Sequence, residues 1–546
     1  MNFKNKALFF ILFLAFAVRV SFLTYTPPSL NWDEISHGYN AYSILKTGKD
    51  EWGKTMPISF RAYGDYKLPV YIYLTAVSEL FFGLAPLAVR LPSALAGTIT
   101  VILTYLLVKE LVKKEKVALL SAFLMAVEPW SLFLSRGAFE ANLAPALIVS
   151  GVYFFLKARS NPSFLIPGST LLGLSVWTYN SARIFVPLLI IVLAVIYWQN
   201  IKKGFSVSKR TVVFPLLIVF FFLAPMFFQL FRPAGFARYG WVAILDEGAI
   251  NKILDLRLKI NAPYPIPRLI SNKATYFAKI FTKNYFSHFS PEFMFFKGGT
   301  NYQFSVPDRG LIYFLNLPFF VLGLIYLIKN YKNKSHQLIL TWFLLSPIAS
   351  SLTREAPQVL RSAVMLPMPM VISALGFGWV IKNKWAVTGY VLALLLFLEN
   401  YLTAYFTEYR LNYSWSWQYG YKEAVNYIKE NYEKYDKIIV TKKYGEPHEF
   451  LLFYLQYAPS KFVNDPNLVR FFQSNWYWVD RFDKFYFVND WQVKDMKLES
   501  GGTVDCSPST VHCLLISSPD NSPSGWRKLE TIKFLDSKPA FEMYEN

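Results

Sequence analysis

The chain has 546 residues, of which 54% are hydrophobic, 18% aromatic and 17% charged. Soluble globular proteins are about 45–50% apolar and ~25% charged, so this composition indicates a protein partly surrounded by lipid and excludes disorder, a coiled coil and a disulfide-rich secreted scaffold. The formal net charge of +20 would indicate a nucleic-acid binder in a soluble protein, but in a membrane protein Lys and Arg gather in cytoplasmic loops. The distribution of the charge decides between these classes.

Runs of about 20 apolar residues, long enough to cross a bilayer as helices, recur from Ala7 to Phe406. The run 68–84 is also apolar, but it is short, begins with Leu68-Pro69 and contains Glu79. The first run has no small-residue cleavage site, so we expect it to be retained as a span. Without 68–84, the pattern predicts eleven spans, near 7–25, 90–108, 117–134, 141–156, 164–179, 184–199, 211–231, 311–328, 337–352, 362–381 and 385–405.

The basic residues orient these spans. If 68–84 does not cross and the N-terminus is cytoplasmic, the short inner segments hold seventeen Lys or Arg and only two acids, Glu110 and Glu115. If 68–84 crossed, the basic loop 109–116 and every later loop would lie outside, against the positive-inside rule. We therefore predict that 68–84 lies on the outer membrane surface, and the charge requires no nucleic-acid partner. The inner segments are 1–6, 109–116, 157–163, 201–210, 329–336 and 382–384.

Two outer loops, 26–89 and 232–310, belong to the predicted transmembrane module 1–406. The long apolar runs end there, and residues 407–546 have a different pattern. In this last part strand-like runs at 437–441, 484–488 and 513–517 alternate with helix-like runs. This alternation predicts a small α/β domain, which an odd number of spans places outside the cytoplasm. A Cys506–Cys513 disulfide and a pair of unlinked thiols are both compatible with the sequence.

With this topology several charged residues share the outer side of the membrane. Charges at the membrane boundary are costly to bury, so such clusters usually line a polar cavity. Acids beside fixed cations suit transfer from a phosphate-linked donor, because one acid deprotonates the incoming hydroxyl while cations neutralise the departing phosphate. The residues are Asp33, Glu34 and Lys67 in the first outer loop, Arg136 and Glu140 in SRGAFEAN, and Arg354, Glu355 and Arg361 in SLTREAPQVLRS.

This pattern resembles the lipid-dependent glycosyltransferases of the GT-C fold, especially glycosyltransferase family 39, which includes protein O-mannosyltransferases and relatives of the lipid A aminoarabinose transferases. The similar features are the Asp-Glu pair soon after the first span, the YKLP element at Lys67, AVRLPSALAG at 88–97, Ser135-Arg136 followed by Glu140, and RSAVMLPMP at 361–369. The resemblance is good over 1–200, looser over 300–406 and poor over 407–546. It implies a GT-C-like helical membrane protein with outer juxtamembrane helices.

The resemblance also implies roles for residues. By its position in the family pattern, Asp33 would be the catalytic base, and Glu34 would orient Asp33 or the acceptor. Lys67, Arg136 and Arg361 would contact the polyprenyl phosphate of the donor, and Glu140 would be a supporting acid. Leu68 and Glu140 depart from the residues common in the family, Pro and Asp, and these departures leave the sugar open, whether hexose or pentose. The expected reaction is an inverting displacement of polyprenyl phosphate by the acceptor hydroxyl of a glycan, glycolipid or protein.

Each site residue also has a simpler interpretation. Asp33 and Glu34 would cap a helix that begins near Ile35, or hold a divalent cation with His37. Lys67, Arg90 and Arg136 would be interfacial snorkelling residues, and Arg136 with Glu140 an ion pair. Glu355 would balance Arg354 and Arg361. No cofactor is required by the sequence, although a divalent cation stays open. Trp415 and Trp417 fit interfacial aromatics better than sugar platforms.

Three other functions are compatible with the sequence. They are an oligosaccharyltransferase-like enzyme, a transporter or flippase of lipid-linked sugars, and a membrane-anchored binding protein. Transport predicts ionisable residues deep within the spans and pseudo-symmetric halves, whereas the charges here lie mainly at span ends, with Arg19 an exception. Eleven spans exceed what an anchor needs. We therefore expect a multi-pass glycosyltransferase of the cell membrane that acts on the extracytoplasmic side.

Overall fold

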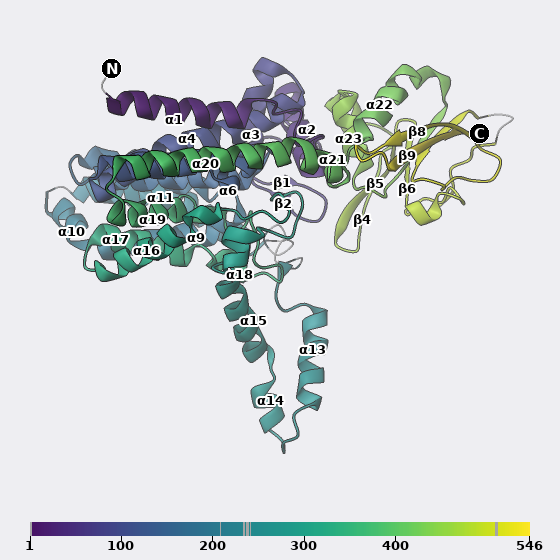
Figure 1. Cartoon of the computed structure of the whole chain (residues 1–546). Helices are drawn as coiled ribbons and strands as arrows, with labels where there is room; N and C mark the ends of the chain where they lie inside the picture. The colour runs from purple at the N-terminus through teal and green to yellow at the C-terminus, as the bar shows by residue number, and fades with distance from the viewer. Residues whose placement is uncertain (1–2, 208, 233–234, 236–239, 241, 508–510) are drawn as a thin grey trace. The chain divides into compact units, whose positions relative to one another are not determined.

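The computed structural model describes residues 3–207, 209–232, 235, 240, 242–507 and 511–546. The chain forms two compact units (Figure 1). Unit 1 comprises Met1–Arg19, Ser93–Ser135 and Phe139–Tyr401, and unit 2 comprises Val20–Pro92, Arg136–Ala138 and Leu402–Asn546. Unit 2 thus combines the segment predicted as the first outer loop, 26–89, with the C-terminal domain, although these parts lie far apart in the sequence.

Unit 1 is helical, and each of the eleven predicted spans carries a helix. Part of α1 and most of α4 belong to this unit, and Pro129 separates α5 from α6 within the predicted span 117–134. The helices are α1 (Phe3–Val20), α4 (Pro86–Val112), α5 (Glu115–Val127), α6 (Pro129–Leu134), α7 (Glu140–Lys157), α8 (Leu165–Ser175), α9 (Asn180–Ile196), α10 (Trp198–Val207), α11 (Lys209–Leu230), α13 (Glu247–Leu258), α14 (Ile266–Ile270), α15 (Lys273–Ser287), α16 (Leu317–Lys329), α17 (Lys334–Leu345), α18 (Ile348–Ser351), α19 (Met368–Val380) and α20 (Lys384–Ala404).

Four helical segments in the described part of the chain are long and apolar enough to cross a membrane, at Pro86–Val112, Lys209–Leu230, Ala363–Val380 and Lys384–Asn412. Asn180–Ile196 and Phe314–Lys329 are apolar but shorter. The protein is therefore a multi-pass membrane protein with a mainly helical fold. The count of eleven crossings and their orientation stay predictions.

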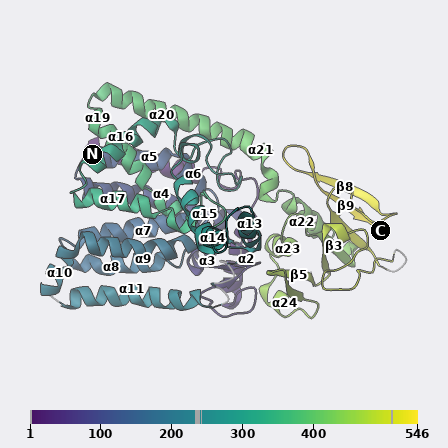
Figure 2. The same ribbon diagram turned by 90° about the horizontal axis from the view of Figure 1, so that it is seen from below.

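Close helix packing in unit 1 depends on small residues. An added Cβ at Gly376 of α19 would lie 1.9 Å from the Phe319 carbonyl oxygen, and one at Gly323 of α16 would lie 2.0 Å from the Ile372 oxygen. Only glycine allows these two backbones to approach so closely. Helices α7, α8 and α11 also lie side by side (Figure 2), while α13, α14 and α15 form an arm that projects from the helical layer (Figure 1).

In unit 2 the first outer loop forms α2 (Trp32–Thr47), a hairpin of β1 (Phe60–Arg61) and β2 (Tyr66–Lys67), and α3 (Pro69–Phe82). Proline at the first position of α3 suits a helix start, because it has no N–H to leave unsatisfied. The helix buries Tyr71 and Ile72 but exposes Leu80 and Phe81, which are 66% and 78% exposed. This distribution suits a helix that lies along an apolar surface, as predicted for 68–84.

The C-terminal domain is α/β, as the sequence predicts. Its mixed sheet has the order β4-β5-β6-β3-β7-β9-β8, with β3 parallel to both β6 and β7. Three strands, β3, β6 and β7, coincide with the predicted runs. The elements are α21 (Arg410–Asn412), α22 (Tyr421–Glu430), β3 (Lys437–Thr441), α23 (Pro447–Tyr454), α24 (Pro459–Val463), β4 (Val469–Gln473), β5 (Trp476–Phe482), β6 (Phe485–Val488), β7 (Cys513–Ser517), β8 (Arg527–Lys533) and β9 (Pro539–Glu545).

Both faces of the central strands are buried, so these strands are apolar without alternation. On one face Ile439 and Leu515 pack against Val493 and other side chains of the segment 489–506. On the other face Tyr421 of α22 stacks on Phe450 of α23 at 4.1 Å and contacts Phe541 of β9. A Cys506–Cys513 disulfide closes the loop before β7, so the bonded alternative is confirmed.

Candidate active site

The acidic pair lies at the start of α2, which begins at Trp32, slightly before the predicted start. Asn31 caps the helix: its side chain accepts the Glu34 N–H at 3.0 Å, and the Glu34 carboxylate accepts the Asn31 N–H at 3.0 Å. This reciprocal arrangement is a capping box. The capping interpretation is therefore correct for Glu34, although the N-cap residue itself is Asn31.

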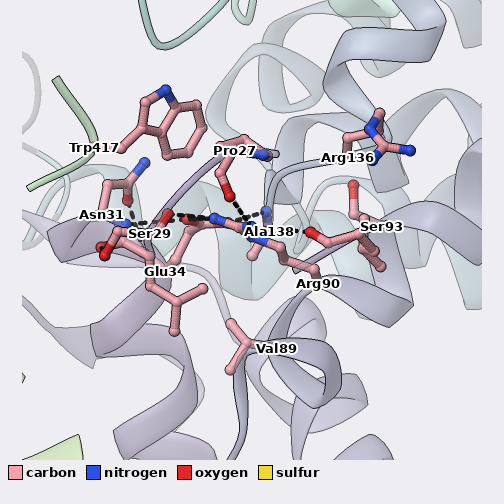
Figure 3. Close-up of polar contacts among 12 residues, drawn as sticks. Pro27, Ser29, Asn31, Glu34, Val89, Arg90, Ser93, Arg136, Ala138 and Trp417 are labelled. Carbon is pink, nitrogen blue, oxygen red and sulfur yellow. Dashed lines mark hydrogen bonds and ion pairs between the residues drawn. The ribbon is translucent and has the colours of Figure 1, made fainter. Parts of the chain in front are cut away.

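Glu34 is also the acid of a buried ion pair (Figure 3). Arg90 Nε and Nη2 donate to the two carboxylate oxygens at 2.8 and 2.9 Å, and the Ala138 N–H donates to Oε1 at 2.8 Å. Both side chains are only 1% exposed. No site role was predicted for Arg90 from the sequence. Its interpretation as an interfacial snorkelling residue is wrong, because the guanidinium is buried against a carboxylate.

Arg90 also fixes the loop before α2. Its Nη1 donates to the carbonyl oxygens of Leu23 and Pro27 at 3.0 and 2.8 Å, and its guanidinium lies 5.7 Å from the ring centroid of Trp417. Figure 3 shows Arg90 between Glu34 and the Pro27 carbonyl. A single arginine thus connects the loop, the first turn of α2 and the segment that enters the C-terminal domain.

Asp33, one residue before Glu34, has the opposite environment. Its side chain is 52% exposed, and its Oδ1 accepts a hydrogen bond from the Lys67 ammonium, which is only 7% exposed. The β1–β2 hairpin positions Lys67, since Phe60 pairs with Lys67 and Arg61 pairs with Tyr66. The structure therefore brings together the proposed base and one proposed phosphate ligand.

Arg136 lies in the same unit, but its guanidinium is buried. Its Nη2 donates to the carbonyl oxygens of Phe22 and Thr26 at 3.0 and 3.2 Å, and the group lies over the rings of Tyr405 and Phe406 at 5.4 and 5.0 Å. The side chain has no exposed surface. In this conformation Arg136 holds backbone carbonyls, so its predicted contact with a donor phosphate stays a prediction.

Glu140 and Arg361 belong to unit 1. Glu140 is the first residue of α7. Arg361 is 12% exposed and donates to Thr353 Oγ1 at 3.0 Å and to the Glu355 carboxylate at 3.4 Å, so Glu355 does balance this arginine. Arg354 pairs instead with Asp246 at 3.0 Å. The predicted roles of Glu140 and Arg361 in transfer stay predictions.

A group of buried carboxylates in unit 2 was not identified from the sequence. Glu51, Glu446 and Glu449 are all at most 3% exposed. Asn40 donates to Glu51 Oε1 at 3.0 Å, and the Trp476 indole donates to Glu446. The available sequence signal was two acids, Glu446 and Glu449, at helical spacing around the otherwise apolar helix α23.

Burial changes the protonation of this group. Desolvation raises the pKa of Glu446 to about 7, and it raises the pKa of Glu449, which lies beside Glu51, well above the usual value. Burial, together with the nearby Arg470 and Lys442, lowers the pKa of His448, so its contact with Glu446 joins a neutral imidazole to a carboxyl group. Burial also raises the pKa of Glu51, and the charge of each of these two carboxylates opposes ionisation of the other.

The carboxylates Glu51 and Glu449 line a small cavity with Tyr63 and Arg470. Its volume is about 10 Å³, which is room for about one water molecule. Within the described residues, no group of three or more His, Cys, Asp or Glu side chains is arranged to hold a metal ion. His37, considered as a ligand with Asp33 and Glu34, is buried and lies 5.1 Å from the Tyr71 ring. Dependence on a divalent cation stays open.

Comparisons with known proteins show what part of the chain is similar to. Residues 67–228 match the family model described as dolichyl-phosphate-mannose-protein mannosyltransferase. This segment contains Lys67, Arg136 and Glu140. No curated protein sequence matches the chain.

Solved structures are similar in fold. ArnT from Cupriavidus metallidurans in the apo state aligns over 98% of this chain and 97% of its own, with a TM-score of 0.51 and 10% identity. The ArnT structure with undecaprenyl phosphate bound has a TM-score of 0.49 and 11% identity over 99% and 97% of the two chains. The archaeal oligosaccharyltransferase AglB from Archaeoglobus fulgidus, in complex with an inhibitory peptide and a dolichol-phosphate, has a TM-score of 0.47 and 15% identity, over 84% of this chain and 64% of its own.

The chain thus spans less than two thirds of the archaeal oligosaccharyltransferase but nearly all of ArnT. The family model matches residues 67–228, and the fold likeness to ArnT covers nearly the whole chain. The chain therefore has an ArnT-like helical membrane fold of the GT-C type, and its residues 67–228 are similar to the dolichyl-phosphate-mannose-protein mannosyltransferase family.

Proposed function

We propose that the chain is a membrane glycosyltransferase that moves one sugar from a polyprenyl-phosphate-linked donor to an acceptor hydroxyl, with Asp33 as the general base. The observation that supports this most is the contact between half-exposed Asp33 and buried Lys67. The family match supports the donor class, since its description names a dolichyl-phosphate sugar.

Asp33 has the environment that a base needs. Its carboxylate is accessible, and it accepts a hydrogen bond from the Lys67 ammonium. As the acceptor oxygen forms its bond to the anomeric carbon, its proton passes to Asp33. The bond from the anomeric carbon to the phosphate oxygen breaks at the same time, and its electron pair leaves with the polyprenyl phosphate. Attack opposite the leaving group gives inversion at the anomeric carbon.

Lys67 contacts both Asp33 and the donor phosphate in this proposal. An ammonium group has three N–H donors, so in this proposal Lys67 donates to Asp33 and also to the donor phosphate when the donor is bound. The positive charge then stabilises the negative charge that develops on the departing group. Arg136 and Arg361 are further proposed phosphate ligands, and Glu140 a supporting acid.

Glu34 has a structural role in this proposal. Because its carboxylate is occupied by Arg90, Asn31 and Ala138, it positions the first turn of α2 and does not touch the acceptor. Glu34 is therefore a positioning residue, and Asp33 is the member of the acidic pair that acts in catalysis, as the general base. The extracytoplasmic side of the reaction follows from the predicted orientation.

The test uses purified full-length protein and a panel of labelled polyprenyl-phosphate sugars, with and without divalent cations and with hydroxyl acceptors. Transfer is measured as release of the lipid phosphate. Asp33→Asn is expected to lower the rate about 10²–10⁴-fold without changing thermal stability, because it removes the base but keeps the side-chain volume.

Asp495→Asn, at an exposed position of the C-terminal domain, is the matched control and should transfer at the wild-type rate. Full activity of Asp33→Asn would contradict the assignment of the base. Absence of turnover with every donor, under all cation conditions, would contradict the proposed function itself.

A further inference from the structure

A second cavity in unit 2 lies apart from the proposed catalytic pair. It has a volume of about 140 Å³, enough for several water molecules or a small polar group. Its wall includes Thr24, Ser29, Tyr419, Lys422, Glu423 and Tyr454. Asp33 and Lys67 are not among the residues that line it.

The surrounding segments carry the marks of a membrane–water interface. Phe22, Tyr25 and Trp415 are large aromatic side chains with 72%, 49% and 45% exposure. Phe22 and Tyr25 lie at the outer end of the first predicted span, and Trp415 follows the long apolar helical segment Lys384–Asn412. Exposed aromatic residues gather at this level of a membrane protein. Thr24, which lines the cavity, lies between two of them.

A cation at the same level supports this placement. The Arg410 guanidinium lies 3.9 Å from the ring centroid of Tyr25, and its Nε donates to the Tyr25 carbonyl at 3.1 Å. Arginine at such a position lies at the level of lipid phosphates. The cavity is therefore at the depth where lipid headgroups are found.

The wall of the cavity carries one available charge of each sign. Lys422 and Glu423 are consecutive residues in the first turn of α22, and neither forms an ion pair within the described part of the chain. Glu423 Oε2 has no hydrogen-bond donor among the described residues. Arg90 also borders the cavity, but its guanidinium is occupied by Glu34 and backbone carbonyls. A ligand that complements this wall has a negative and a positive end.

Two tyrosines complete the site. The Tyr419 hydroxyl is hydrogen-bonded to Glu423, and the Tyr454 hydroxyl is hydrogen-bonded to Ser29. Burial raises the pKa of Tyr454 to about 12, so both hydroxyls are neutral donors near neutral pH. Their ring faces attract a cation.

We propose that this cavity binds the headgroup of an aminophospholipid of the phosphatidylethanolamine class, with its phosphate on Lys422 and its ammonium on the Glu423 carboxylate beside the rings of Tyr419 and Tyr454. The ammonium supplies the N–H donor that Glu423 Oε2 lacks. Phosphatidylcholine has a bulkier ammonium without N–H, and phosphatidylglycerol has no cation. The site therefore selects the primary amine, and the lipid would hold the loop 23–30 against α22.

The experiment uses the purified full-length protein in detergent and short-chain phosphatidylethanolamine, phosphatidylcholine and phosphatidylglycerol with the same acyl chains. Bound lipid is counted by native mass spectrometry, and the shift in melting temperature gives the affinity. The expected result is saturable binding of phosphatidylethanolamine, about tenfold tighter than that of either other lipid. Neither measurement requires sugar transfer, so failure of this inference is separate from failure of the proposed function.

Variants at the charged pair assign the contacts. Glu423→Gln is expected to weaken binding of phosphatidylethanolamine about tenfold and to leave phosphatidylglycerol unchanged, because only the first has an ammonium. Lys422→Gln should weaken both lipids. Lys429→Gln and Glu430→Gln make the same changes at exposed positions of α22 and should bind like the wild type.

Three outcomes would overturn the inference. The first is equal affinity of the wild type for all three lipids. The second is tighter binding of phosphatidylglycerol, which would indicate a simple phosphate site. The third is wild-type binding of phosphatidylethanolamine by Glu423→Gln, provided that the lipid-free variant melts at the wild-type temperature.

Discussion

Two neighbouring acids at the start of α2 have different environments, and helix geometry explains why. Successive residues of a helix point about 100° apart, so Asp33 faces outward while Glu34 faces the interior. Asp33 is 52% exposed, and Glu34 is 1% exposed and paired with Arg90. Burial removes the hydration of a carboxylate, and this free-energy cost must be offset by a partner inside the protein. Glu34 therefore requires Arg90. Asp33 is therefore the acid of the pair that an acceptor could reach.

The Arg90–Glu34 pair makes a prediction about stability. Arg90→Met removes the cation and leaves the buried Glu34 carboxylate with only the N–H groups of Asn31 and Ala138, so we expect the unfolding free energy to fall by about 3–5 kcal/mol. Thermal unfolding of the detergent-solubilised protein measures the effect.

Arg527→Met is the matched control, because this arginine is 74% exposed in its pair with Glu545, and exposed pairs contribute about 0–1 kcal/mol. Equal melting temperatures for the two variants would show that the buried pair does not stabilise the start of α2.

At the scale of elements, α23 brings two acids into the interior of unit 2. Helix α23 packs against α2 and α22, and this packing buries Glu446 and Glu449 beside Glu51. Their pKa values rise because desolvation disfavours the charged form. The cost of ionising these groups makes the packing of α23 sensitive to pH.

Glu446→Gln tests this sensitivity. The pKa of Glu446 is about 7 in the folded protein against 4.5 as the usual value, so between these pH values the folded state binds more protons than the unfolded state. The stability contributed by this group is therefore full below about pH 4.5 and is lost as the pH rises to 7, by up to about 3 kcal/mol. The variant, which cannot ionise, should show a flatter decline in unfolding free energy over this window. A wild-type pH profile in the variant would contradict the assignment.

The contact between α2 and α23 depends on one glycine. A Cβ at Gly38 would lie 2.5 Å from Phe453 Cε2 and 2.8 Å from Val89 Cγ2. Gly38→Ala should therefore lower the unfolding free energy by about 1–3 kcal/mol, despite the better helix propensity of alanine. Differential scanning fluorimetry measures the change.

Gly389→Ala, in α20, is the control, because a Cβ there meets nothing within 4 Å. This substitution should be neutral or slightly stabilising. A Gly38 variant as stable as the Gly389 variant would show that α2 and α23 do not pack this closely.

For the whole molecule, the predicted orientation is open to a direct test. The two cysteines form a disulfide, so a Cys506→Ser/Cys513→Ser background has no cysteine. Lys461→Cys, in the C-terminal domain, should react with a membrane-impermeant maleimide in intact cells, whereas Lys114→Cys, in the basic loop 109–116, should react only after lysis. The reverse pattern would place the C-terminal domain and Asp33 on the cytoplasmic side.

Much of the fold was predictable because its signals are local. Apolar runs of membrane length predicted where the helices of unit 1 occur, and apolar runs of five residues predicted β3, β6 and β7. The strands β4, β5, β8 and β9 were not predicted. The side chains of β8 are mostly exposed, those of β4 are half-buried or exposed, and neither sequence has the alternation that marks a half-buried strand. Their pairing depends on distant partners.

The membrane character, the positions of the helices, the α/β domain and the candidate residues Asp33, Glu34 and Lys67 could all be predicted from the sequence, because composition, periodicity and charge asymmetry are properties of short segments. The pairing of Glu34 with Arg90, the contact of Asp33 with Lys67 and the proximity of Glu51 to Glu449 became evident only in the folded chain. Burial and ion pairing depend on which distant segments pack together. The order of residues along the chain therefore indicates candidate groups, and their protonation and accessibility follow from the fold.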